Sequence, residues 1–166
     1  MSTTSTSRSQ TGAPAGIDPR GPQVAAALTS LVLVVVLLLA PSTAATVLLA
    51  VQAVLFPLGA ARGVQHTPYA WLFRTLVRPR LAAPTDLEDP APPRFAQSVG
   101  LVFAVVGLVG FGTGLTALGL VATGLALVAA LLNAVFGFCL GCEMYLLIKR
   151  VTPQPRAPQR TAAQER

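Results

Sequence analysis

Four long apolar stretches govern what this chain can fold into. They cover about residues 24–40, 44–61, 95–112 and 115–148, and Glu143 is their only charged residue. About 20 apolar residues in a helix cross the roughly 30 Å hydrocarbon core of a bilayer. The chain is 11% charged and 53% hydrophobic, whereas about a quarter of the residues in a soluble domain are charged. The sequence therefore predicts an all-α membrane protein with four transmembrane helices.

Short links divide these stretches into two tandem hairpins. Residues 41–43 join the first two stretches and residues 112–114 join the last two, so each pair must run antiparallel. Residues 62–94 form a loop between the hairpins. The membrane domain is expected to cover residues 17–151. It is flanked by tails, residues 1–16 and 152–166, whose polar and Pro-rich composition predicts disorder.

Positive charge is distributed unevenly along the chain. All twelve Lys and Arg residues lie in the two terminal segments or in the 62–94 loop, and neither hairpin link carries a charge. Lys and Arg are retained on the cytoplasmic side of a membrane. We therefore predict a multi-pass protein of the cell membrane, with both termini and the central loop in the cytoplasm.

The central loop contains an amphipathic stretch. Aromatic and aliphatic side chains, including Tyr69 and Trp71, alternate in helical fashion with Arg74 and Arg78. Aromatic rings prefer the headgroup layer, and arginines meet anionic lipid there. The stretch is predicted to form a short helix on the inner leaflet, with a docking site for a partner protein as the alternative.

The two hairpins resemble each other in sequence. Residues 22–25 open the first much as residues 93–96 open the second. A second alignment pairs Gln52 with Asn133, two amides inside apolar stretches. We expect a parallel repeat about a pseudo-twofold axis along the membrane normal. Each amide is expected to hydrogen-bond across helices, to the other amide or elsewhere, and a role in binding substrate is the alternative.

Both cysteines lie late in the last stretch, where Cys139 and Cys142 have C-x-x-C spacing and Glu143 follows. Residues three apart share a helix face, so the two thiols can approach disulfide geometry. Their reactivity depends on whether the helix breaks near residues 137–141. An unbroken helix leaves Glu143 to raise the thiol pKa values, whereas a helix that starts here lowers them. These three residues are the candidate catalytic residues, and packing as small apolar side chains is the alternative for the cysteines.

Depth in the membrane gives a further expectation. Along an unbroken helix, Cys142 lies nearer than Cys139 to Lys149 and Arg150, which mark the inner interface. Cys142 should then meet water-borne reagents first.

Other chemistries find little support in the sequence. A metal site would need His66, the single histidine, beside the cysteines and Glu143, and nothing places it there, so no metal is assigned. The sequence contains no phosphate-binding loop, hydrolytic triad or dinucleotide motif, so no cofactor is assigned. The net charge of +6 lies beside apolar spans, which explains it without nucleic acid.

Several short motifs together resemble a known family. They lie at residues 17–22 (IDPRGP), 76–79 (LVRP), 88–90 (EDP), 93–97 (PRFAQ) and 138–143 (FCLGCE). The pattern is similar to an uncharacterised family of actinobacterial integral membrane proteins, domain-of-unknown-function family 4395, over about residues 17–150. This resemblance implies company with genes for thioredoxin-like proteins and sulfurtransferases, and so points to thiol or sulfur chemistry.

Three functions are compatible with these features. The first is a membrane thiol-redox or sulfur-relay protein whose C-x-x-C pair near the inner leaflet exchanges with a cytoplasmic thioredoxin-like protein or sulfurtransferase. The second is a non-catalytic membrane anchor or assembly component. The third is a small permease for a sulfur species, working as a homodimer. The sequence leaves open whether the protein is an enzyme.

Overall fold

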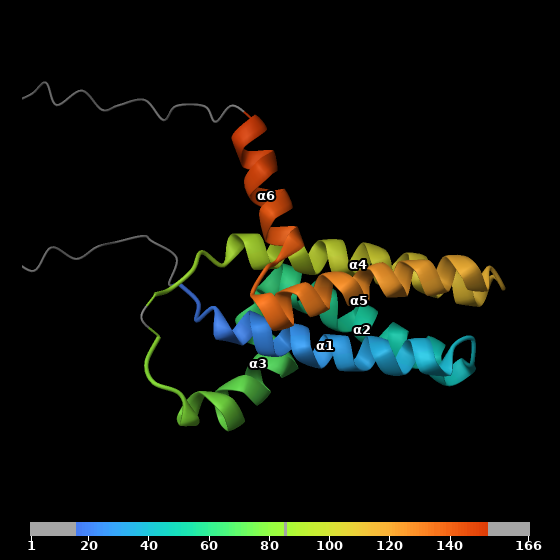
Figure 1. Ribbon diagram of the computed structural model, residues 1–166, viewed down its shortest axis with the longest axis horizontal. Coiled ribbons are helices and arrows are strands. Elements are labelled where there is room, and N and C mark those ends of the chain that lie inside the picture. The colour runs from blue at the N-terminus through green and yellow to red at the C-terminus, as the bar shows by residue number, and fades with distance from the viewer. Residues whose placement is uncertain (1–15, 85, 153–166) are drawn as a thin grey trace, which may run out of the picture.

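Four long helices form the body of the protein. The computed structural model describes residues 16–84 and 86–152, so the disorder expected for residues 1–15 and 153–166 lies outside the described residues. The long helices are α1 (Arg20–Leu39), α2 (Thr43–Arg62), α4 (Ala91–Gly112) and α5 (Thr116–Phe136). All four are long and apolar enough to cross a membrane, and both hairpin links lie at one end of the bundle (Figure 1). The prediction of an all-α protein with four membrane-length helices is confirmed.

An Asp-Pro pair starts the first helix of each hairpin. Asp18 Oδ1 accepts a hydrogen bond from the backbone N of Arg20 at 3.0 Å, and Asp89 Oδ1 accepts one from the backbone N of Ala91 at 2.8 Å. Each carboxylate satisfies an N–H that has no partner inside its helix and complements the positive end of the helix dipole. α1 and α4 therefore begin in the same way, as a duplication requires.

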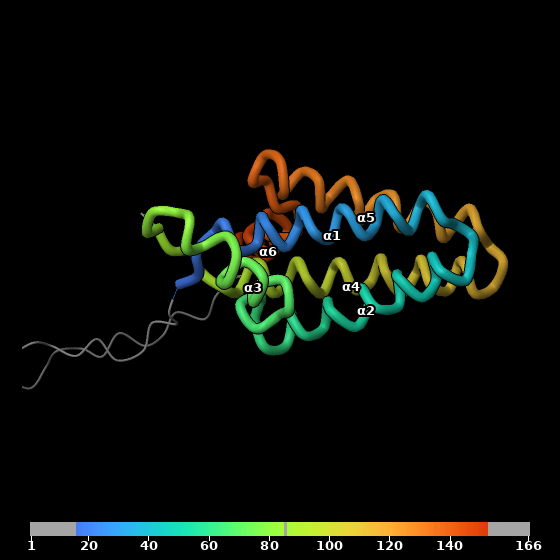
Figure 2. Tube along the Cα trace, turned by 90° about the horizontal axis from the view of Figure 1, so that it is seen from below, coloured from blue at the N-terminus to red at the C-terminus, as the bar shows by residue number. Residues whose placement is uncertain are grey.

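A backbone pairing joins the starts of the two hairpins. Ile17 and Glu88 form an antiparallel bridge, with N to O distances of 2.9 Å in one direction and 3.0 Å in the other. Each stands directly before its Asp-Pro pair, so the bridge connects the same position in both halves. α1 packs against α5, and α2 packs against α4. This crosswise packing, visible in Figure 2, fits a pseudo-twofold axis along the bundle.

The repeat does not make Gln52 and Asn133 equivalent. Gln52 is buried in the middle of α2, whereas Asn133 lies in the last turn of α5. Gln52 Nε2 donates to Thr29 Oγ1 of α1 at 3.4 Å, and the Tyr69 hydroxyl donates to Gln52 Oε1 at 2.7 Å. Gln52 thus bonds across helices, but to Thr29 and not to Asn133. The alignment of these two amides is wrong because α5 ends at Phe136, soon after Asn133, while α2 continues from Gln52 to Arg62.

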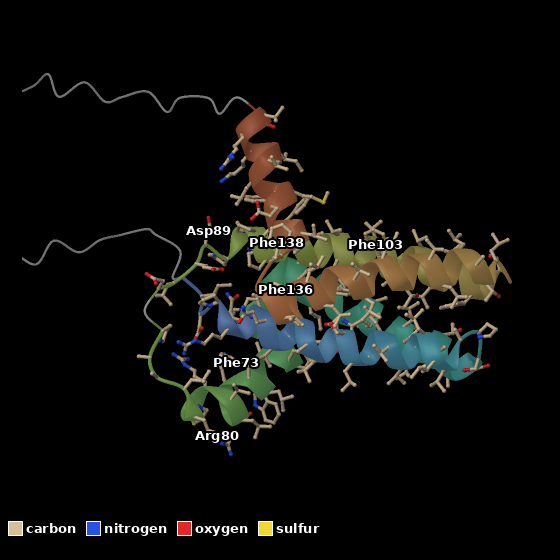
Figure 3. The ribbon with its side chains drawn as sticks, viewed as in Figure 1. Phe73, Arg80, Asp89, Phe103, Phe136 and Phe138 are labelled. Carbon is tan, nitrogen blue, oxygen red and sulfur yellow. The ribbon has the colours of Figure 1, made fainter. Side chains whose placement is uncertain are left out.

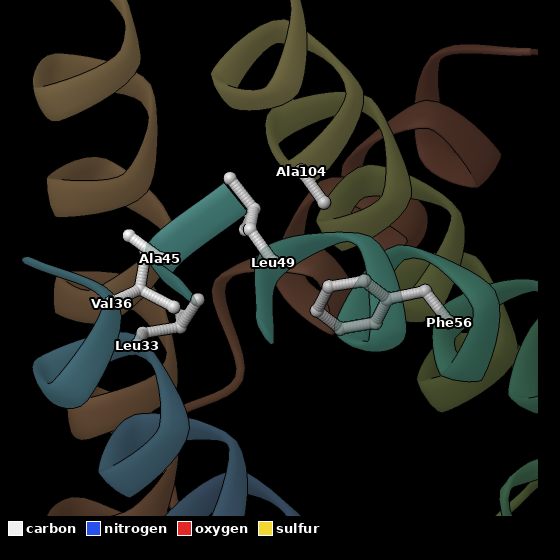
Figure 4. Close-up of a cluster of buried hydrophobic side chains, with 6 residues drawn as sticks. All are labelled: Leu33, Val36, Ala45, Leu49, Phe56 and Ala104. Atoms are coloured by element: carbon white, nitrogen blue, oxygen red, sulfur yellow. The ribbon is translucent and has the colours of Figure 1, made fainter. Parts of the chain in front are cut away.

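Small residues let α4 and α5 approach closely. A Cβ added to Gly110 of α4 would lie 2.4 Å from the backbone N of Gly119 in α5, a separation that real Cβ atoms do not show. Ala122, one turn after Gly119, is also buried. Close backbone approach at such positions is how membrane helices gain packing energy. The buried centre of the bundle, drawn in Figure 4, is formed by Leu33, Val36, Ala45, Leu49, Phe56 and Ala104.

The central loop folds back on the bundle. It contains η1 (Val64–His66), α3 (Pro68–Leu72), the π-helical turn η2 (Phe73–Val77) and η3 (Arg78–Arg80). The expected amphipathic helix is therefore present, as consecutive turns of different pitch. Trp71, Arg74 and Arg78 are exposed. Tyr69 instead turns inward to bond with Gln52, so it belongs to the bundle and not to the exposed face.

The last expected stretch, residues 115–148, is two helices. α5 ends at Phe136, Gly137 adopts a left-handed conformation with φ 67°, and α6 (Leu140–Val151) begins three residues later. The backbone N of Gly137 donates to the Asn133 carbonyl at 3.0 Å, the bond that closes a glycine-terminated helix. α6 then turns away from the bundle (Figure 1). The break that the sequence left open is present, and it lies directly before the cysteines.

Candidate functional site

Cys139 is the N-cap residue of α6. Its backbone is extended, with φ −89° and ψ 100°, and its Sγ accepts a hydrogen bond from the backbone N of Cys142 at 3.4 Å. Ser, Thr, Asp or Asn usually occupies this position, because a side-chain acceptor satisfies a free N–H of the first turn. Here a thiol takes that place, so its sulfur faces the positive end of a helix dipole.

This geometry separates the two thiols chemically. The pKa of Cys139 is lowered from 9.0 to about 7, first by a hydrogen bond from the Cys142 thiol and then by backbone hydrogen bonds from Cys142 and Gly141, against the opposing effect of burial. The pKa of Cys142 is raised, first by that same hydrogen bond and second by burial. Cys139 is therefore the thiol that ionises first, and Cys142 keeps its proton and donates it in the hydrogen bond that stabilises the Cys139 thiolate.

Two carboxylates act on the thiol pair. Glu88 opposes ionisation of both cysteines, whereas Glu143 raises only the pKa of Cys142, as its weakest influence. Glu143 is exposed in the first turn of α6, where a negative charge favours the helix. The sequence analysis missed Glu88, which stands far from the cysteines in the chain. Its position directly before the Asp-Pro pair that starts α4 was the available signal.

A glycine between the cysteines fixes the start of α6 on α4. Gly141 is buried, and a Cβ added to it would lie 2.6 Å from the Ala96 Cα of α4. Further along, the Tyr145 ring packs on Phe95 with 5.8 Å between centroids. These contacts hold the first turn of α6, and with it the Cys139 cap, against the beginning of α4. Figure 3 shows Asp89, from just before α4, and Phe138, from just before α6, at the same end of the bundle.

The first half of the repeat contains a similar helix start without thiols. α2 ends before Gly63, which has a φ of 95°, and Thr67 then caps α3, its side chain accepting from the backbone N of Ala70 at 3.3 Å. Thr67-x-x-Ala70 thus starts a helix after the second long helix of the first half, as Cys139-x-x-Cys142 does in the second half. A hydroxyl suffices to cap the helix in the first half, so helix capping does not by itself require the cysteines of the second half.

A cavity of about 660 Å³ lies beside the thiols, lined mainly by α1, α4, α5 and α6, with Phe56 of α2 and Val64 of η1. Both cysteines line it, together with Asn133 and the two acids Glu88 and Glu143. Its volume falls within the range of small-molecule sites. Asn133, in the last turn of α5, thus lines this cavity and does not pair with Gln52.

His66 lies apart from this site. Its Nδ1 is 2.7 Å from the carbonyl oxygen of Arg62, at the end of α2. Within residues 16–84 and 86–152, no group of three or more His, Cys, Asp or Glu side chains is placed to hold a metal ion.

Comparison with known protein families gives a match over most of the chain. The family model described as "Domain of unknown function (DUF4395)" matches residues 17–150. That range includes the four long helices and the C-x-x-C pair. No curated protein and no solved structure gives a significant match. The chain therefore belongs to the DUF4395 family, whose function is unknown.

Proposed function

We propose that this protein is a thiol-disulfide exchange protein of the cell membrane, which oxidises a dithiol on a cytoplasmic partner of the thioredoxin-like or sulfurtransferase type. The observation that carries the proposal is the position of Cys139 at the N-cap of α6, with its Sγ 3.4 Å from the backbone N of Cys142. A cysteine at a helix N-terminus has a stabilised thiolate. Stabilising the reduced form makes the corresponding disulfide a stronger oxidant.

The exchange has two steps. A partner thiolate attacks Cys139 Sγ, a bond between the two proteins forms, and the Cys139–Cys142 bond breaks, so that Cys142 leaves and takes up a proton. The second partner thiolate then attacks the partner sulfur that is bonded to Cys139. Cys139 leaves as the thiolate that the first turn of α6 stabilises. The partner loses two electrons and two protons; the pair gains two electrons and the proton on Cys142, and the second proton passes to water.

The charges around the thiols favour disulfide exchange over transfer of an anionic sulfur species. Glu88 and Glu143 line the same cavity as the cysteines, and like charges repel an approaching persulfide or sulfide anion. The same repulsion counts against a permease for anionic sulfur species. A partner cysteine is mostly a neutral thiol near neutral pH, so it approaches with less repulsion than a sulfide or persulfide anion and ionises only for the attack.

The position of α6 supports a site at the inner leaflet. α6 runs across the bundle direction (Figure 1) and exposes Met144, Leu147 and Ile148, while Lys149 and Arg150 follow in its last turn. A helix with an apolar face and terminal cations suits the surface of an anionic leaflet. The thiols would then lie at the boundary between lipid and cytoplasm.

Alkylation with a charged, membrane-impermeant maleimide in inverted vesicles tests the proposal. We expect Cys139 to react in reduced vesicles and to be protected after oxidation, and we expect Cys142→Ser to trap a mixed disulfide with the partner through Cys139. Cys139→Ser should trap none. If neither thiol reacts before or after reduction, and both variants fold and support growth as the native protein does, the protein is a non-catalytic anchor instead.

The proposed orientation has its own test. Alkaline phosphatase fused after Arg150 should be inactive, because that position would lie in the cytoplasm, whereas the enzyme inserted in the link 41–43 should be active. The reverse pattern of activity would invert the topology and place the thiols outside.

A further inference from the structure

The cavity beside the thiols extends from the start of α6 into the part of the bundle formed by the membrane-length helices. Phe56 of α2, Phe103 of α4 and Leu125 of α5 line it. Leu125 and Val128, which also line it, are 53% and 54% exposed. These two side chains lie on a helix that is apolar enough to face lipid. The cavity is thus accessible to a molecule dissolved in the bilayer.

The chemistry of the lining selects a neutral ligand. Among the described residues that line the cavity there is no Lys, Arg or His, whereas the acids Glu88, Asp89 and Glu143 line it. An anionic ligand would be repelled and would find no cation to pair with. The remaining polar groups that could bind a ligand include the neutral amides of Gln23 and Asn133. A mostly apolar cavity with a few polar groups suits an uncharged molecule with hydrogen-bonding oxygens.

One amide reaches the linker between α5 and α6. Gln23 Nε2 lies 2.7 Å from the position that a Cβ on Gly137 would occupy, so this side chain reaches the linker that carries Cys139. An amide N–H there can donate to a carbonyl oxygen of a ligand. Such a bond strengthens as the oxygen gains negative charge during reduction.

We infer that the cavity binds a lipid-soluble quinone, which reoxidises the Cys139–Cys142 dithiol after each exchange. This inference rests on the thiol exchange proposed above, because that exchange leaves the pair reduced and requires a two-electron acceptor. A quinone is neutral, dissolves in the bilayer, accepts two electrons and carries two carbonyl oxygens. The apolar walls, the lipid-facing side chains and the neutral amides match these properties.

The reaction balances with the groups present. The Cys139 thiolate forms a bond to the quinone, and Cys142 Sγ then attacks Cys139 Sγ. The disulfide bond forms as the bond between sulfur and quinone breaks, and its electron pair stays with the quinone. The leaving quinol takes one proton from the Cys142 thiol and one from water. The pair is oxidised by two electrons and the quinone is reduced by two.

The test uses the full-length reduced protein in lipid nanodiscs with decylubiquinone, a fully substituted quinone that free thiols attack poorly. We expect one quinol formed and one disulfide gained per protein. Ala129→Phe, which fills the cavity from α5, should slow quinol formation at least tenfold. Ala117→Phe adds the same ring at an exposed position of α5 outside the cavity and should leave the rate unchanged.

Exchange with a soluble disulfide, measured on the same three proteins, separates the outcomes. Equal exchange rates in all three show that the Ala129→Phe protein is folded and that only access of the quinone has changed. If the native protein exchanges with the soluble disulfide but forms no quinol, or if Ala129→Phe forms quinol as fast as Ala117→Phe, the quinone site is refuted while the thiol exchange stands. If the native protein reacts with neither reagent, the thiol exchange fails as well.

Discussion

The hydrogen bond from the Cys142 thiol to Cys139 can be removed or conserved by a single substitution. Cys142→Ala deletes the donor that contributes most to lowering the Cys139 pKa, whereas Cys142→Ser keeps an O–H in the same place. The backbone N–H of residue 142 remains in both variants. We therefore expect the pKa of Cys139 to stay at about 7 in the serine variant and to rise toward its ordinary value in the alanine variant.

The size of the effect on reactivity follows from the two pKa values. At pH 7, a thiol with a pKa of about 7 is half ionised, whereas one at 9.0 is about one hundredth ionised, a roughly fifty-fold difference in thiolate. The more acidic thiolate is also the weaker nucleophile, and a Brønsted coefficient of roughly 0.4–0.5 reduces its intrinsic rate by about six- to tenfold. The net advantage of Cys139 over an ordinary thiol is thus about five- to eightfold at pH 7, and Cys142→Ala should lose much of it.

The pH dependence of the alkylation rate shows in which direction the Cys139 pKa moves in each variant. The alkylation rate of Cys139 in Cys142→Ser should rise with pH and level off above about 7, while the rate in Cys142→Ala should still be rising at that pH. The assay is alkylation with a charged maleimide in detergent, with the modified residue identified by mass spectrometry. Coincident pH profiles for the two variants would refute the thiol hydrogen bond, and a midpoint near 9.0 in both would refute the low pKa of the helix cap.

Two further predictions use matched pairs of substitutions. Glu88→Gln should lower the Cys139 pKa and speed its alkylation below pH 7, whereas Glu143→Gln should leave the Cys139 profile in place, because only Glu88 acts on that thiol; the same maleimide assay checks both. Gly110→Ala should destabilise the bundle by about 1–3 kcal/mol, because its Cβ would overlap the backbone of α5. Gly124→Ala, where an added Cβ meets nothing within 4 Å, should leave thermal stability in detergent unchanged or slightly higher. Equal losses at the two glycines would contradict the close contact of α4 and α5.

Which of the two thiols reacts first could not be predicted from the sequence, because the order depends on whether the last helix is continuous. The expectation that Cys142 reacts first rests on its shorter distance to Lys149 along an unbroken helix, taken as its depth below the inner interface. Gly137 ends α5, and α6 leaves the bundle direction, so that distance no longer measures depth. The structure favours Cys139 as the first thiol to react, because helix capping sets its ionisation.

Sequence alone determined the four membrane-length helices, the two hairpins and the amphipathic loop. These features depend only on residues close together in the chain. The residues of a segment fix its free energy of transfer into lipid and its helical periodicity. The C-x-x-C spacing and the similar openings of the two hairpins were also readable, because each is a relation between residues at known positions in the chain.

Tertiary structure decided what the thiols can do. The break at Gly137 is accompanied by the contact of Gly141 with Ala96, which lies in a different helix, α4. The influence of Glu88 on the thiols and the cavity beside them likewise require α4 to lie against α6. Such contacts join residues far apart in the sequence, and their free energies depend on packing between helices, which no local hydropathy or spacing encodes. Cys139 is therefore a candidate nucleophile only because the fold makes it the N-cap of a helix.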